Sequence, residues 1–261
     1  MFCKRFIFHP SSVSLSSPFL LFSLLLFSLT FAACDSGDIV EKTTADENNG
    51  HTVKLSVSVT GMSDLNEKYS LALATFKSGD NYALTTFGIP TNTKDHELVN
   101  IVAPNIDGDV STVELVIINR LRQRIMTLAS INMDEYADAT DTIRMEAGAV
   151  NVNMFNLIQQ RVFNMSCVQC HGGNGGSGAA NLNLTEGKAF DNLVDVPSTR
   201  KEGRFRVVSG TASQSLLHQI LAEGGEDILH YNHTEVLSSQ FKNDVAPVRT
   251  FIDDWINDLK K

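Results

Sequence analysis

Two cysteines and a histidine stand together in Cys167-Val-Gln-Cys170-His171, the part of this 261-residue sequence with the most reactive side chains. Thiols three positions apart can close a redox-active disulfide, supply half of a zinc site, or attach covalently to a cofactor that the adjacent imidazole then ligates. Five glycines follow within residues 172–178, and three of them match the G-x-G-x-x-G pattern of dinucleotide-binding loops. Features elsewhere in the sequence are needed to distinguish these four kinds of site.

Residues 1–33 predict a secretory signal peptide. A positive start at Lys4 and Arg5 precedes the 12-residue apolar run Pro18–Leu29, which is shorter than the roughly 20 residues that a membrane-spanning helix needs. The run leads to Phe31-Ala32-Ala33-Cys34, which resembles the lipobox of bacterial lipoproteins, although that family usually carries Leu where Phe31 stands. The resemblance implies cleavage before Cys34 and a lipid anchor on that cysteine. The alternative is an ordinary signal peptide with an incidental cysteine.

The remaining cysteines limit the chemistry further. Cys3 leaves with the signal peptide and Cys34 carries the lipid, so only Cys167 and Cys170 remain in a chain exported to the bacterial cell envelope, facing the periplasm or the cell surface. Beyond that one pair, no framework of structural disulfides can form.

The charge balance is acidic. The formal net charge is −9, and it becomes −11 once the signal peptide, with two bases and no acids, is removed. Nucleic-acid binding depends on clustered Lys and Arg, so the composition argues against a nucleic-acid partner. Residues 34–50 are polar and predict a flexible tether between the anchor and the first domain.

Residues 51–149 predict an all-β domain. Thr52–Thr60 alternates Val and Leu with Lys and Ser, as a strand with one buried face requires. Six similar runs follow, some of them separated by turn residues. These runs are Leu71–Phe76, Tyr82–Phe87, Glu97–Val102, Thr112–Asn119, Arg124–Ile131 and Thr142–Glu146. Seven short strands in about a hundred residues indicate an immunoglobulin-like sandwich, and its histidines, His51 and His96, stand alone without a catalytic grouping.

Residues 150–261 predict a second, mainly α-helical domain with long irregular connections. Apolar residues recur at helical spacing in Asn153–Met165, which leads directly into the cysteine motif, and again in Ser213–Glu223 and Ala246–Leu259. A small helical domain with such connections needs something besides its own side chains to fill its centre.

The helical setting favours covalent haem attachment. C-x-x-C-H is the attachment sequence of c-type haem, in which two thiols one helical turn apart bond to the two vinyl groups and the histidine binds the iron. A redox pair would normally begin a helix after a strand, a structural zinc needs four ligands, and the glycine loop follows no strand. The sequence therefore predicts one haem c, bonded to Cys167 and Cys170 and ligated by His171, with the glycines fitting the backbone round the ring.

The second axial ligand must come from elsewhere in the chain. No methionine follows Met165, so the downstream Met that many small cytochromes use is absent. His218 lies within an apolar helical run, where packing alone explains it equally well. His230 and His233 lie in the irregular segment LHYNHT before the last helix. On this reasoning all three remain open.

Residues 160–258 resemble the single-haem cytochrome c domains of bacterial surface and periplasmic proteins, including the planctomycete-type group. The resemblance rests on CVQCHG, LNLTEGKAFDNL at 182–193, VSGTASQSLL at 208–217 and FIDDWI at 251–256. LHYNHT replaces the Met-Pro ligand segment of that family, so the resemblance implies bis-histidine coordination. The family's spacing before Trp255 favours His233 over His230 as the distal ligand.

The expected function is outer-sphere electron transfer by a lipid-anchored cytochrome, with redox proteins as partners. No nucleophile or base beside an open iron position is recognisable, so no enzymatic activity is expected. The alternative is a surface binding or assembly module, in which the β region recognises a protein or glycan and the haem is structural or sensory. An oxygen- or peroxide-reactive haem enzyme would need an open sixth position on the iron.

Overall fold

The computed structural model describes residues 50–173, 179–222, 225–229, 231–242 and 245–260. Within them, strands dominate residues 51–151 and helices dominate residues 154–258. The predicted signal peptide, most of the tether and Cys34 lie outside the described residues. Within those residues, no helix is both long and apolar enough to cross a membrane. The strands are β1 (His51–Thr60), β2 (Tyr69–Phe76), β3 (Thr85–Gly88), β4 (Glu97–Ile106), β5 (Thr112–Asn119), β6 (Arg124–Asn132) and β7 (Ile143–Asn151).

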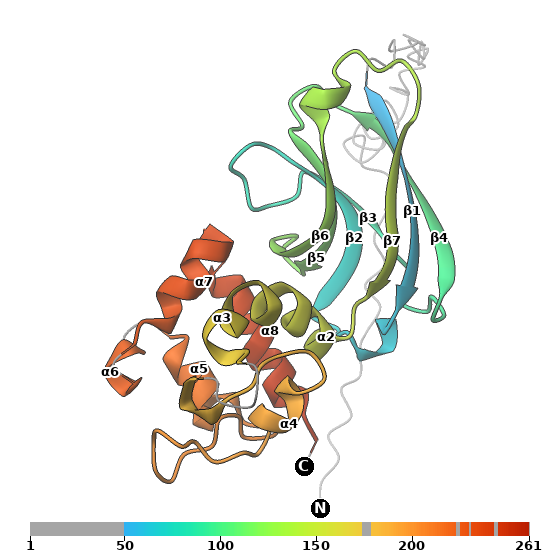
Figure 1. Ribbon diagram of the computed structural model, residues 1–261. Coiled ribbons are helices and arrows are strands. Elements are labelled where there is room, and N and C mark those ends of the chain that lie inside the picture. The colour runs from blue at the N-terminus through green and yellow to red at the C-terminus, as the bar shows by residue number, and fades with distance from the viewer. Residues whose placement is uncertain (1–49, 174–178, 223–224, 230, 243–244, 261) are drawn as a thin grey trace, which may run out of the picture. The chain divides into compact units, whose positions relative to one another are not determined.

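The strands form two sheets (Figure 1). β1 lies between β4 and β7 in the three-stranded sheet, and the other sheet has the order β3-β2-β5-β6. β1 and β7 run parallel, and the other pairs are antiparallel. The alternation predicted for β1 is present, because Val53, Leu55, Val57 and Val59 are buried while the residues between them are partly exposed. These side chains share one apolar core with residues of β2 and β5, so the two sheets pack against each other.

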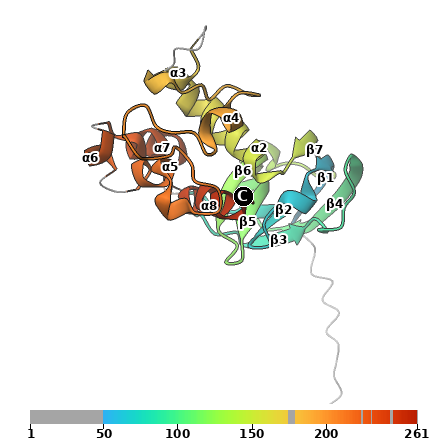
Figure 2. The ribbon, with the colours of Figure 1, turned by 90° about the horizontal axis from the view of Figure 1, so that it is seen from below.

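A continuous helical stretch follows β7. It consists of α2 (Met154–Ile158), the π-helix η4 (Gln159–Cys167) and α3 (Val168–His171). Two short 3₁₀ helices, η2 (Met62–Asp64) and η3 (Met133–Tyr136), occur among the strands. The remaining helices are η5 (Ala179–Asn181), α4 (Ala189–Leu193), η6 (Ala212–Gln214), α5 (Leu216–Ile220), α6 (Glu226–Leu229), α7 (His233–Phe241) and α8 (Val245–Asp258). In two perpendicular views these helices gather beside the strands (Figures 1 and 2).

The expected fold class, an immunoglobulin-like all-β domain followed by a separate, mainly α cytochrome c-like domain, is wrong. Residues 48–261 form one compact unit. Phe251 of α8 is fully buried, and its ring packs edge-on against Tyr69 of β2 with centroids 4.8 Å apart. Asp254, one turn further along α8 and also buried, accepts hydrogen bonds from the Tyr69 hydroxyl (2.7 Å) and the Lys68 amino group (2.6 Å).

The physical reason is a shared apolar core. One continuous set of buried side chains runs from β1 through the strands into α2, η4 and α8. The apolar stripe of residues 246–259 was visible in the sequence, but periodicity shows only that a helix face is apolar and not what covers it. Here the strands cover part of that face, so the main core is shared between the strands and the helices.

Candidate functional site

The cysteine–histidine motif lies at the end of the helical stretch α2–η4–α3. Asn153 caps the start of this stretch, where its side chain accepts the Asn156 N–H at 3.1 Å. Ile158 and Phe163 are buried in the shared core and hold the stretch in place. Nine residues of it are wound as a π-helix, and π-helical turns within helices often occur at functional sites.

The chain leaves the helix directly after His171. A Cβ on Gly172 would collide with the Val168 carbonyl oxygen, so this position requires glycine. The His171 Nδ1–H donates a hydrogen bond to the Ala179 carbonyl oxygen at 2.9 Å, which leaves Nε2 free to bind a metal. Burial lowers the pKa of His171, the bond to Ala179 opposes this, and the charge of Arg206 adds to the lowering. The imidazole is therefore held in the neutral form that ligates metals.

His233 is the first residue of α7. Asn232 caps this helix, its side chain accepting the Glu235 N–H at 2.9 Å. The Nδ1–H of His233 donates to the Tyr231 carbonyl oxygen at 3.2 Å, so Nε2 is again the free nitrogen. Burial lowers the pKa of His233, although the bond to Tyr231 opposes it, and the nearby His171 adds to the lowering. Both imidazoles thus have the same tautomer and the same neutral state.

The imidazoles of His171 and His233 lie across a cleft from each other. Their centroids are 6.4 Å apart, and their planes differ by 13°. Two metal–imidazole bonds of about 2 Å, together with ring radii of roughly 1 Å, place two imidazoles on opposite sides of one metal ion about 6 Å apart. The observed centroid separation is close to that value.

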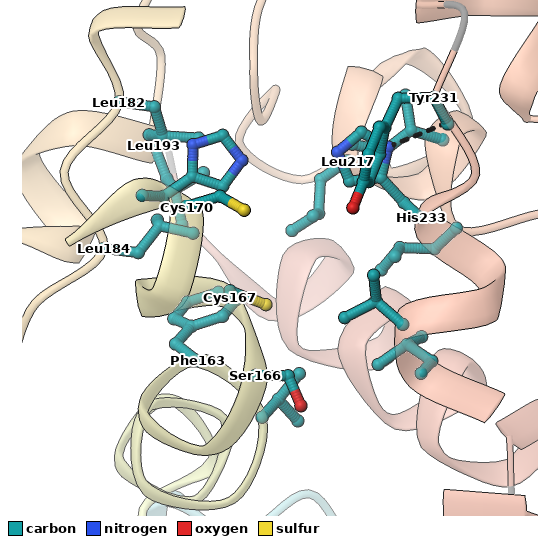
Figure 3. A pocket seen from close by; sticks show the side chains of 16 residues that line it. Phe163, Ser166, Cys167, Cys170, Leu182, Leu184, Leu193, Leu217, Tyr231 and His233 are labelled. Carbon is teal, nitrogen blue, oxygen red and sulfur yellow. Dashed lines mark hydrogen bonds between the residues drawn. The ribbon is translucent and has the colours of Figure 1, made fainter. Parts of the chain in front are cut away.

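The cleft is open to solvent, and its cavity of about 80 Å³ is smaller than the roughly 300–1,000 Å³ that is usual for cofactor pockets. Figure 3 shows Cys167 and Cys170 on one wall and Tyr231 and His233 on the opposite wall, with both sulfur atoms directed into the space. Most of the remaining lining is apolar. It includes Phe163, Leu184, Leu193, Leu217, Leu221 and Leu237.

The two cysteines are free thiols in different surroundings. Cys167 is half-buried and Cys170 is exposed. Burial raises the pKa of Cys167 to about 12, with a smaller contribution from Cys170. A thiol that remains protonated at neutral pH is a poor nucleophile, and this applies to Cys167. Across the described ranges, no three His, Cys, Asp or Glu side chains come together to hold a metal ion.

The other histidine candidates lie elsewhere. His218 of α5 does not line the cleft. Its Nδ1 pairs with the Asp253 carboxylate of α8 at 2.8 Å, which ties two helices together. His230 lies outside the described residues, as do Gly175 and Gly178 of the glycine loop. The structure therefore brings Cys167, Cys170, His171 and His233 to one cleft.

Sequence reasoning missed helix α7 and placed His233 in an irregular segment. The signal that could have found it is Asn232 followed three residues later by Glu235, a pattern typical of helix starts. Tyr231 was also missed, although its ring packs edge-on against His233 with centroids 4.9 Å apart. The carbonyl of Ala179, which holds His171, could not be identified from residue types, because every residue carries a carbonyl.

Comparisons with models of protein families, with curated proteins and with solved structures find no match for this chain.

Proposed function

We propose that this chain is a c-type cytochrome that carries one haem and transfers electrons. The observation that carries the proposal is the His171–His233 pair, with near-parallel imidazoles whose centroids are 6.4 Å apart, in an apolar cleft that both motif cysteines also line.

The residues present fit a haem in three respects. The cleft offers two neutral imidazoles, each with Nδ1 bonded to a backbone carbonyl and Nε2 free. Its two thiols lie one helical turn apart on one wall, as attachment to two vinyl groups requires. Because a porphyrin itself supplies four nitrogen ligands, two histidines are all that the chain would have to add.

Cys167 and Cys170 would hold the group through thioethers, and His171 and His233 would bind its iron. A bound haem supplies an iron that alternates between the ferric and ferrous states. If both imidazoles bind the iron, they would leave it no open position for a substrate, and this supports outer-sphere electron transfer over catalysis.

The chain's own residues set the properties of this centre. The apolar lining makes the cleft less polar than the surrounding solvent, and the backbone carbonyls of Ala179 and Tyr231 orient the two imidazoles and raise their basicity. A second imidazole stabilises the ferric state more than a thioether sulfur does, so the reduction potential should lie below that of a His/Met cytochrome.

In this proposal the lipid predicted on Cys34 anchors the protein at the bacterial cell envelope, and its partners are redox proteins there. The anchor is tested separately from the haem. Conversion of Cys34 to Ser should release the protein from the membrane fraction and leave haem attachment unchanged, whereas retention in that fraction would contradict lipidation at Cys34.

Haem attachment is tested by expressing the full chain in a bacterial periplasm that contains the attachment machinery. The purified protein should show a c-type pyridine haemochrome spectrum and the mass of one covalent haem. The matched control is the double-serine variant, Cys167→Ser with Cys170→Ser, which should lack both signals. A wild-type protein without covalent haem would overturn the proposal.

A further inference from the structure

The turn that holds His171 has an unfavourable backbone. Ala180 has φ 60° and ψ 26°, and Asn181 follows with φ 49°, so two consecutive non-glycine residues adopt the left-handed conformation. For an alanine this conformation brings Cβ too close to its own backbone. The carbonyl just before them, that of Ala179, is the one that accepts the His171 N–H. Surrounding contacts must therefore hold the turn.

Arg206 supplies most of those contacts. Its guanidinium donates to the carbonyl oxygens of Ala180 and Asn181, both at 3.0 Å, and to that of Asn192 at 2.8 Å. The residue is only 8% exposed. In the part of the chain that the structure describes, it forms no ion pair with a carboxylate. A buried arginine whose N–H groups donate to several backbone carbonyls acts as a structural clamp on the segments that carry those carbonyls.

The backbone beneath Arg206 is itself fixed. Its neighbours Phe205 and Val207 form bridges with Pro197 and Val194, and the Arg206 N–H donates to the Val196 carbonyl at 2.9 Å. On the other side of the turn, the Thr199 hydroxyl donates to the Ala180 carbonyl at 2.7 Å. The guanidinium thus joins a rigid segment to the strained turn, and Thr199 adds a second, weaker tie.

We propose that Arg206 is a positioning residue for the proximal ligand: it clamps the left-handed turn so that the Ala179 carbonyl holds the His171 N–H. This inference rests on the proposed function, because it concerns His171 as an iron ligand. A firm bond at Nδ1 makes the imidazole a stronger donor to ferric iron and lowers the reduction potential. A loosened turn should weaken that bond and raise the potential.

The charge of Arg206 acts in the opposite direction. A nearby cation disfavours the ferric state, so removal of the charge alone would lower the potential. Arg206→Lys separates the two effects, because lysine keeps the charge but lacks the planar fork that reaches three carbonyls. Thr199→Val, which removes only the second tie to Ala180, should act in the same direction with a smaller shift.

The experiment measures the reduction potential and the solvent exchange of the His171 Nδ1 proton by NMR in the haem-loaded wild type and variants. Arg206→Lys should raise the potential and speed proton exchange. Ala180→Gly with Asn181→Gly should leave the wild-type potential unchanged, since glycine adopts the left-handed conformation freely. Combined with Arg206→Lys, the two glycines should restore both the potential and the exchange rate.

An unchanged potential and exchange rate in both Arg206→Lys and Thr199→Val would overturn the inference, even if the melting temperature falls, because that pattern is expected of a purely structural arginine. A potential that falls in Arg206→Gln but stays constant in Arg206→Lys would assign the effect to charge and would also overturn it. If Arg206→Lys fails to fold, the Thr199→Val measurement decides. A wild-type protein without haem would instead refute the proposed function.

Discussion

Conversion of Phe251 to Ala should destabilise the strands and the helices together. The Phe251 side chain is fully buried and contacts the ring of Tyr69, at the place where α8 meets β2. Removal of a buried phenylalanine ring costs about 3–5 kcal/mol, a large share of the roughly 5–15 kcal/mol that stabilises a typical domain. For a unit of this size the melting temperature should fall by about 10 °C.

The assay follows denaturant unfolding of the haem-free double-serine variant with and without Phe251→Ala. Trp255 is the only tryptophan in the sequence and lies in α8, so its fluorescence reports on the helices. The far-UV circular dichroism signal of β-sheet reports on the strands. Both midpoints should shift by the same amount. Phe205→Ala, at an exposed phenylalanine, is the control and should change stability by less than about 0.5 kcal/mol.

A shift confined to Trp255, with the strand transition unchanged, would refute the single shared core. It would mean that the strands form a stable unit on their own.

Three further predictions concern the cleft and the β core. His233→Ala should open one axial position, so carbon monoxide should bind the ferrous variant but not the ferrous wild type; binding to the wild type would contradict ligation by His233. In the haem-free double-serine variant, burial holds the pKa of His171 and of His233 below the unfolded value of about 6.5. Below that pH the unfolded chain therefore binds more protons than the folded chain does. Its stability should therefore fall as the pH drops below about 6.5 and should fall less when His233→Gln is added; an equal loss in both proteins would refute this cause. Glu114→Gln breaks the 2.8 Å pair with Arg124 inside the β core and should cost about 3 kcal/mol by denaturant unfolding, whereas Asp109→Asn at an exposed pair should cost less than about 1 kcal/mol. Equal costs would show that burial does not set the strength of these pairs.

Local structure followed closely from residue patterns. The alternation in Thr52–Thr60 predicted a strand, and β1 spans His51–Thr60. The apolar spacing of Ala246–Leu259 predicted a helix, and α8 spans Val245–Asp258. The assembly of these elements did not follow, because the Tyr69–Phe251 and Tyr69–Asp254 contacts join residues that are far apart in the sequence. An apolar stripe predicts burial without identifying the partner.

The candidate site, too, could be predicted from the sequence only in part. The spacing in Cys167–His171 predicted that its side chains would act together, and the resemblance implied His233 as their counterpart. The structure brings these residues to one cleft. The groups that orient the imidazoles are backbone carbonyls of Ala179 and Tyr231. No residue type marks a carbonyl that a fold will place beside an imidazole, so only the structure could locate them.

The most direct test of the central claim is the electron paramagnetic resonance spectrum of the oxidised, haem-loaded wild type. Two neutral imidazoles whose planes differ by only 13° should give a low-spin ferric signal with the rhombic pattern of parallel axial ligands. A high-spin signal, or the strongly anisotropic signal of perpendicular ligand planes, would contradict His171 and His233 as the ligand pair in this geometry.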